Sequence, residues 1–178
     1  MTTWFTSDLH LNHRAVIRMN NRPFEDVRQM NDTIIQNINA LVRPNDTLYL
    51  LGDLCHRTGI ETGSELISRI KCKNKILVKG NHDKKWNPEL FIEICDFKEI
   101  HETIRGENYH ISAMHYPMLS WPKSHHGSIQ LHGHIHSDGL YNIQMLEEGI
   151  RRFDVGVDAN NFYPVSLEQI LSFMGLIE

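Results

Sequence analysis

Residues 75–83 read KILVKGNHD, an apolar run that ends in a glycine, an amide, an imidazole and a carboxylate. The apolar part predicts a buried strand. The polar ending at 80–83 allows two interpretations: a tight turn with no further role, or a strand end that presents metal-binding and proton-transferring side chains. The rest of the chain decides between them, because a functional site needs further residues of the same kind.

Four other apolar runs end in the same way. Together the five runs deliver, in chain order, Asp8 and His10 (TWFTSDLH), Asp53 (TLYLLGD), Asn81, His82 and Asp83 (KILVKGNHD), His115 (YHISAMHYP), and His132, His134 and His136 (SIQLHGHIH). In open α/β sheets, ligands bind outside the carboxyl ends of the strands. Five strand ends that carry Asp, Asn or His therefore predict one site with many ligands.

The spacing within two of these motifs strengthens the prediction. Asp8 and His10 are two residues apart, and so are His134 and His136. In an extended segment, side chains two residues apart point to the same side. Each pair can therefore direct two ligands toward one ion or toward two adjacent ions.

Glycines precede several of the candidate ligands. Gly52, Gly80 and Gly133 each stand directly before one of the polar endings or within it. Glycine lets the backbone turn sharply and approach other groups closely, as the crowding of ligands around a metal requires.

The ligand types indicate which metals would bind. The candidate set holds two carboxylates, one amide oxygen and four imidazoles, without a thiolate. Such a mixed oxygen and nitrogen set favours manganese, with iron, zinc, cobalt or nickel as alternatives, over calcium or a structural zinc. Seven ligands exceed the need of one tetrahedral ion, so we expect two divalent metal ions that share a carboxylate. Asp53, alone at its strand end, is the candidate bridge.

Each motif taken alone also has an ordinary interpretation. Asp8 could be a turn aspartate, His115 a core histidine, GNHD a plain turn, and HGHIH a surface segment that scavenges metal. The ordered combination, with every motif directly after an apolar run, favours a shared site.

The hydrophobic pattern predicts an α/β fold. Apolar runs at 2–7, 47–51 and 75–79 predict strands. The residues at 13–20, 25–42 and 63–72, where apolar side chains recur at helical spacing, predict helices between them. Fully apolar strands separated by helices favour parallel pairing. The second half predicts strands near 96–105, 108–114, 128–132 and 153–158, with little helix, and the segment 137–152 has no clear pattern. A final helix should follow Ser166 as its cap.

Size and composition are typical of one globular domain spanning residues 1–178. The chain has 22 acidic and 18 basic residues, a formal net charge of −4, which argues against a protein that coats nucleic acid or anionic membrane. Three cysteines without a CxxC motif favour a reducing compartment. With no secretory signal and no long apolar run, we expect a soluble, cytoplasmic protein without a membrane partner; the oligomeric state is open.

The ordered set SDLH, LGD, GNHD, MHYP and HGHIH, over residues 6–136, resembles the calcineurin-like metallophosphoesterase superfamily. The resemblance implies a four-layer α/β/β/α sandwich of two mixed sheets with two metals at one edge. It implies a first metal held by Asp8, His10, Asp53 and His136, and a second held by Asp53, Asn81, His115 and His134. It also implies that His82 is the general acid. The closing stretch DVGVDANNFYPVS is similar to small bacterial and phage members.

The sequence departs from the protein-phosphatase branch, which has GDxxDRG where this chain reads GDLCHRT. His56 replaces the aspartate that orients the catalytic histidine there, and Thr58 replaces the last glycine. Arg57 matches an arginine that contacts phosphate. Protein-phosphatase activity is therefore not expected. The partner that orients His82 is open, because the adjacent Asp83 can point away.

The expected reaction is hydrolysis of phosphate esters, with metal-bound hydroxide as nucleophile, Asp53 and Asn81 among the catalytic residues, and His82 protonating the leaving group. We expect a phosphodiesterase acting on a small phosphorylated or nucleotide-like substrate. Alternatives are a phosphomonoesterase, a nuclease acting on nucleic-acid ends, and a catalytically silent metal-binding scaffold.

Candidate substrate contacts lie just beyond the ligand-bearing strand ends. They are His13, Arg14, His56 and Arg57. Arg14 has an alternative interpretation, because with Arg18 and Arg22 it forms a row at four-residue steps that is typical of a solvated helix face. The loop SWPKSHHG at 120–127 is either a substrate wall or a plain exposed loop.

Overall fold

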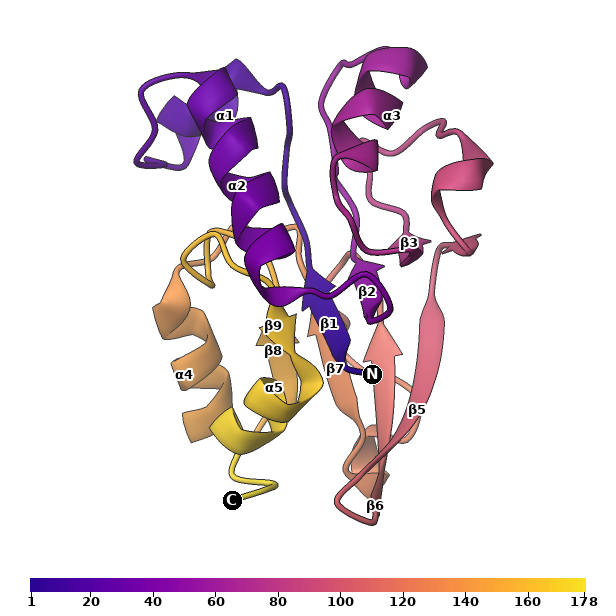
Figure 1. Cartoon of the computed structure of the whole chain (residues 1–178). Helices are drawn as coiled ribbons and strands as arrows, with labels where there is room; N and C mark the ends of the chain where they lie inside the picture. The colour runs from indigo at the N-terminus through magenta and orange to yellow at the C-terminus, as the bar shows by residue number, and fades with distance from the viewer.

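The computed structural model describes residues 1–178 as two mixed β-sheets and five α-helices (Figure 1). The first sheet has the order β4-β3-β2-β1-β9, with strands β1 (Thr3–Thr6), β2 (Thr47–Leu50), β3 (Asn74–Val78), β4 (Glu93–Cys95) and β9 (Val165–Ser166). Strands β1 to β4 are parallel, and β9 runs antiparallel to β1. The second sheet has the order β5-β6-β7-β8, with strands β5 (Lys98–Ile104), β6 (Glu107–Ala113), β7 (Ile129–His132) and β8 (Arg152–Asp154). Strands β6, β7 and β8 are parallel.

The helices are α1 (Arg14–Met19), α2 (Val27–Leu41), α3 (Ile60–Ser68), α4 (Gly139–Glu147) and α5 (Leu167–Phe173), with two short 3-10 turns, η1 (Pro88–Leu90) and η2 (Ser124–His126). Helix α2 begins where the carboxylate of Asp26 accepts a hydrogen bond from the N–H of Gln29. Figure 1 shows α4 and α5 together near the C-terminus, beside β8 and β9. No helix combines the length and apolar character that crossing a bilayer would need.

Alternation along β2 explains why Leu48 to Leu51 are apolar without a break. Leu48 and Leu50 belong to the core formed with the helices, whereas Tyr49 and Leu51 belong to the core shared by the two sheets and α5. Successive side chains of a strand point to opposite faces, so a sheet that is covered on both sides needs an apolar residue at every position.

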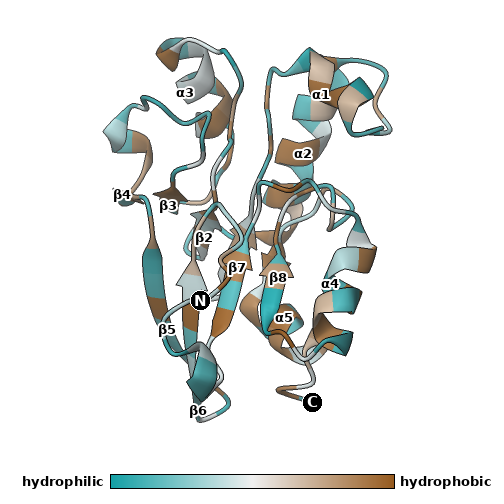
Figure 2. Ribbon diagram, turned by 180° about the vertical axis from the view of Figure 1, so that it is seen from behind, coloured by the Kyte–Doolittle hydropathy of each residue, from teal (hydrophilic) through white to brown (hydrophobic).

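The second sheet is covered less completely. Along β5, exposed and more buried residues alternate, and Ile100 is its one fully buried residue. Figure 2 shows this sheet from behind, with much of β5 in the hydrophilic colour. The outer face of the sheet at β5 is therefore in contact with solvent, while α4 packs beside β8.

The two sheets meet at the end where their parallel strands stop. Beyond β1, Ser7 forms a parallel bridge with Gly156, which follows β8, and the N–H of Val157 donates to the carbonyl of Ser7 at 3.1 Å. This junction brings the carboxyl ends of strands from both sheets to one edge, as the sequence predicts.

Most predicted elements are confirmed, but helix α3 differs. It spans Ile60–Ser68 rather than 63–72. Gly63 was expected at its start but lies inside it. A Cβ at this position would come within 3.2 Å of the Trp86 ring, so only a glycine leaves Trp86 its full room. A tertiary contact therefore places this glycine within the helix, against its low helix propensity.

The segment 137–152, which had no clear pattern, contains helix α4. Its periodicity is weak because Leu140, Ile143 and Leu146 are all exposed. Its start is nevertheless defined by Asp138, whose carboxylate accepts from the N–H of Leu140 at 3.0 Å. The short strands β4 and β9 were also missed, and the strand predicted at 153–158 is shorter, because β8 spans only Arg152–Asp154.

The predicted cap of the last helix is confirmed and is testable. The hydroxyl of Ser166 accepts from the N–H of Gln169, and the Gln169 side chain accepts from the N–H of Ser166. We expect Ser166→Ala to lower the free energy of unfolding by about 1 kcal/mol in urea denaturation. Ser172→Ala, at an exposed position of the same helix, is the control and should change it by less than about 0.5 kcal/mol. Equal effects of the two substitutions would contradict this role.

Candidate metal centre

One group of donor atoms comes from the ends of β1 and β7. Asp8, His10 and His136 place one ligand atom each within 4.8 Å of one another. The Nε2 atoms of His10 and His136 are 3.1 Å apart, and Nε2 of His136 lies 3.9 Å from Oδ1 of Asp8. These are the residues predicted for the first metal, apart from the bridging carboxylate.

A second group comes from the ends of β3, β6 and β7. Oδ1 of Asn81 lies 3.1 Å from Nε2 of His115 and 3.1 Å from Nδ1 of His134. The two histidine nitrogens are 3.3 Å apart. The structure therefore brings together the three residues predicted for the second metal alone.

Asp53 stands between the two groups. Its Oδ2 atom lies 3.6 Å from Nε2 of His10 and 3.5 Å from Nε2 of His115. Burial would raise the pKa of Asp53, but the interaction with His115 and the N–H of His82 outweigh burial and lower it to about 2. A carboxylate that stays charged and faces both groups has the position of a bridging ligand.

The donor atoms fit a cation. Asp8 is fully buried, and its Oδ1 has no hydrogen-bond partner in the protein. Burial raises the pKa of Asp8 to about 6, and burial together with His136 lowers the pKa of His10 to about 2. A buried carboxylate oxygen without a hydrogen-bond partner is costly in a protein interior, and a bound cation removes that cost.

Backbone carbonyls and carboxylates fix the histidine rings from behind. Nδ1 of His115 lies 2.8 Å from the carbonyl of Leu51, and Nδ1 of His136 lies 2.8 Å from Oδ2 of Asp158. Each Nδ1–H donates to its oxygen, which leaves Nε2 facing the other donor atoms. Such partners set the tautomer and orientation of metal-binding histidines.

The backbone at the ligands corrects one expectation. Asp8, His10, Asp53, His134 and His136 do not lie in extended backbone; their φ angles are 57°, 47°, 54°, 73° and 47°. Left-handed backbone costs roughly 1–2 kcal/mol per non-glycine residue. The paired ligands converge, as predicted, but through tight left-handed turns that the rest of the fold must stabilise.

The predicted role of the glycines is confirmed at two positions in particular. A Cβ on Gly133 would overlap the side chains of Ser7 and Asp8, and one on Gly80 would overlap the Asp53 carboxylate. Segments that carry different ligands therefore touch through backbone that has no side chain in between.

Asp158 and Arg22 are functional residues that the sequence analysis missed. Arg22 donates to Asp158 from Nε and Nη2 at 2.8 Å each, and Nη2 also donates to the carbonyl of Asp8 at 2.8 Å. The prediction that Arg22 belongs to a solvated helix face is wrong, because α1 ends at Met19 and Arg22 is 4% exposed. The signal for Asp158 was present: it stands at the end of the predicted strand 153–158, as the candidate ligands stand at the ends of theirs.

Asp83 points away from His82, which settles one alternative. Its buried carboxylate accepts hydrogen bonds from the N–H groups of Asp53, Leu54 and Gly80 and from the indole of Trp86. Asp83 therefore joins the turn after β2 to the turn after β3.

His82 lies at the rim of the donor atoms. Its Nε2 is 3.8 Å from Oδ2 of Asp53, and its ring meets the edge of His56 at a centroid distance of 4.5 Å. His56 in turn stacks on His13 at 3.9 Å, and Nδ1 of His13 is 3.4 Å from Nδ1 of His10. A row of imidazoles thus borders the site, with His56 between His82 and His13.

Of the other predicted substrate contacts, some line a pocket beside His82 and others do not. Arg57 lines a pocket with His56 and His82. Arg14 is exposed at the start of α1 and is not among the residues lining that pocket. In the loop 120–127, Trp121 donates to the carbonyl of Ser128. The Ser128 hydroxyl donates to the carbonyl of Pro122, and Nζ of Lys123 lies 3.3 Å from Nδ1 of His110 on β6, so the loop packs on itself and beside β6.

The tight packing around Gly133 makes a first prediction for the site. Gly133→Ala should lower the free energy of unfolding by roughly 1–3 kcal/mol and abolish binding of Mn²⁺, because the new methyl group displaces Ser7 and Asp8. Gly139→Ala is the control: its Cβ would lie 3.5 Å from the carbonyl of Ala159, an ordinary contact. Urea denaturation and titration calorimetry measure the two effects, and unchanged Mn²⁺ affinity in Gly133→Ala would contradict the prediction.

Asp158 makes a second prediction. Asp158→Asn weakens the ion pair with Arg22 and the hydrogen bond that orients His136, so Mn²⁺ affinity should fall about 10- to 100-fold. Asp96→Asn is the matched control, since this side chain is 81% exposed and pairs only with Lys79. Calorimetric affinities of the two variants would be compared; equal values would show that Asp158 does not support the centre.

Comparisons with known proteins agree with this geometry. Residues 1–151 match the family model described as calcineurin-like phosphoesterase. The chain is 31% identical over 172 residues to the "Uncharacterized protein MJ1445" of Methanocaldococcus jannaschii, covering 96% of this chain and 90% of the relative. It is 25% identical over 185 residues to the "Gene 66 protein" of Mycobacterium phage L5, covering 88% and 86%.

A solved structure is also similar. The crystal structure of the protein of unknown function AQ665 from Aquifex aeolicus superposes with a TM-score of 0.71 at 26% identity, covering 96% of this chain and 98% of that one. The family model spans every predicted metal ligand, and families of this type generally use a dinuclear divalent metal centre. The chain therefore belongs to the calcineurin-like phosphoesterase family and is a metal-dependent phosphoesterase.

Proposed function

We propose that this chain hydrolyses phosphodiesters of small or nucleotide-like molecules with two divalent cations, of which manganese is the first choice. The observation that carries the proposal is the placement of His82 beside Asp53, the carboxylate that faces both groups of donor atoms. A proton donor at the edge of a two-cation site is the arrangement that ester hydrolysis requires.

The proposed ligand sets follow the two groups. Asp8, His10, Asp53 and His136 would hold the first cation, and Asp53, Asn81, His115 and His134 the second. The short distances within each group support this assignment. Cations bound there supply charge neutralisation for the phosphate oxygens and acidify the attacking water.

His82 has the geometry of the general acid. As the attacking oxygen bonds to phosphorus, the ester P–O bond breaks and the leaving oxygen takes the proton from His82. Asp53 accepts the N–H of His82 through Oδ1 at 2.9 Å, which fixes the backbone that carries the imidazole. Asn81, which directly precedes His82, contacts His115 and His134 and so links His82 to the candidate ligand cluster.

A diester is supported by the surroundings of His82. The imidazole is 36% exposed and opens onto a pocket of about 550 Å³. The pocket is large enough for a substantial leaving group. A phosphate that carries a second ester substituent can therefore be accommodated beside His82.

The activity is tested with purified protein and Mn²⁺ on bis(p-nitrophenyl) phosphate and p-nitrophenyl phosphate. We expect metal-dependent turnover that chelation abolishes, with the diester preferred. A preference for the monoester, or turnover of oligonucleotide ends alone, would support the alternative enzymes. No metal-dependent turnover of any of these substrates would favour a silent scaffold.

His82 can be tested separately from metal binding. His82→Ala should keep Mn²⁺ affinity but lose about 10²–10⁴-fold in kcat on esters with poor leaving groups, and least on p-nitrophenyl esters, which need little protonation. His126→Ala, at an exposed position, is the control and should leave both unchanged. Full activity of His82→Ala on an alkyl ester would remove His82 from the acid role.

A further inference from the structure

A pocket begins at His82 and extends away from the donor atoms. It has a volume of about 550 Å³ and lies between the segment 55–63, which leads into α3, and the segment 82–86 after β3. Among its lining residues is His82, but none of the seven predicted metal ligands. A group bound there would sit on the side of the general acid, where the leaving group of the reaction departs.

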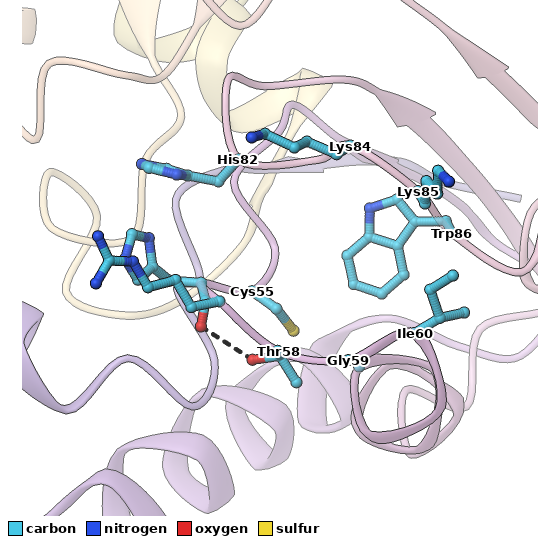
Figure 3. Close-up of a pocket in the computed structure, with 11 residues that line it drawn as sticks. Cys55, Thr58, Gly59, Ile60, His82, Lys84, Lys85 and Trp86 are labelled. Atoms are coloured by element: carbon cyan, nitrogen blue, oxygen red, sulfur yellow. Dashed lines mark hydrogen bonds between the residues drawn. The ribbon is translucent and has the colours of Figure 1, made fainter.

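One end of the pocket is apolar and held in place. Figure 3 shows His82 at one end of the pocket and Trp86 with Ile60 at the other, with Cys55 and Thr58 between them. The indole of Trp86 donates to Oδ1 of Asp83 at 3.1 Å and packs against Gly63 inside α3. A fixed aromatic side chain suits a flat ring, because no conformational freedom is lost on binding.

The pocket is also positively charged. Arg57, Lys84 and Lys85 line it, no lining residue is acidic, and none of these three side chains takes part in an ion pair of the protein. The chain as a whole carries a formal net charge of −4. Three unpaired cations gathered in one concave place therefore create a local field that attracts an anion.

The backbone at Arg57 supports a built site. Its φ angle is 49°, in the left-handed region that non-glycine residues rarely adopt. This turn follows directly on His56, whose ring contacts the ring of His82. Arg57 thus lines the same pocket as His82, and a strained turn holds it there.

We propose that this pocket binds the leaving group of the substrate and that the leaving group is a nucleotide, a flat base that carries a further phosphate. The inference rests on the proposed function. The base lies against Trp86 and Ile60, and the positive charge of Lys84 and Lys85 attracts the additional phosphate, while Arg57 lines the same pocket. Trp86, Lys84 and Lys85 are then specificity-determining residues outside the ligand cluster.

The test measures binding in place of turnover. Protein loaded with Mn²⁺ is saturated with inorganic phosphate, which competes at the metal centre, and titrated with AMP or with adenosine. Calorimetry gives the affinities and tryptophan fluorescence reports the base. We expect AMP to bind about tenfold more tightly than adenosine, because charged hydrogen bonds to one added phosphate give a difference of this order.

Matched variants assign the effect. Lys84→Gln/Lys85→Gln should reduce the preference for AMP to less than about twofold, whereas Lys71→Gln/Lys73→Gln, at two exposed lysines, should leave it unchanged. A base that stacks on Trp86 should quench the tryptophan fluorescence of the protein. Trp86→Phe should remove this quench, whereas Trp121→Phe should retain it. A quench that persists in Trp86→Phe would place the base elsewhere and overturn the proposal.

Two results distinguish this inference from the proposed function. Equal affinity for AMP and adenosine, or no binding of either, in protein that hydrolyses bis(p-nitrophenyl) phosphate with Mn²⁺ would overturn the inference alone. Binding with the expected preference in protein that shows no metal-dependent turnover would contradict the proposed reaction, and with it the assignment of the pocket to a leaving group.

Discussion

The structure depends on one electrostatic constraint: donor atoms that would repel one another are held with their lone pairs facing the same small space. His10 and His136 bring two nitrogens to 3.1 Å, and Asn81 brings an oxygen equally close to His115. Contacts of this kind are favourable only when a cation or proton lies between them. The fold has to create this crowding before any chemistry is possible, and most special features of the chain serve that purpose.

The first such feature is backbone that would be unfavourable elsewhere. Five of the seven predicted ligands lie in left-handed turns, and Gly80 and Gly133 leave no room for a side chain between ligand-bearing segments. Buried charges hold these turns in place: Asp83 binds the turns after β2 and β3, and Arg22 binds the turn after β1 to Asp158. The turns that carry the candidate ligands are thus held by Asp83 and Arg22, which are not among the predicted ligands.

The second feature is a separation of charge around His82. Carboxylates lie on the side of the ligand cluster, and Arg57, Lys84 and Lys85 lie on the other side, along the pocket. The turn 80–86 contributes to both sides, since Asn81 belongs to the cluster and Trp86 to the pocket. A phosphate ester bound across this boundary would have its phosphorus at the cluster and its leaving group in the pocket, with the acid between them.

The sequence by itself determined seven of the nine strands and the polar residues at their ends, and so predicted the candidate ligand set. Burial on both faces requires apolar runs, and the ends of parallel strands share one edge. It also determined the Ser166 cap, which is a local interaction. Only the tertiary structure decided that Arg22 is buried against Asp158, 136 residues away. Only the tertiary structure also explains the glycine at position 63 inside a helix, since Trp86 packs against it. The pocket, too, forms only where the segments 55–63 and 82–86 come together. Local patterns encode burial and capping, whereas the partner of a charged or aromatic side chain depends on which distant segments the fold brings together.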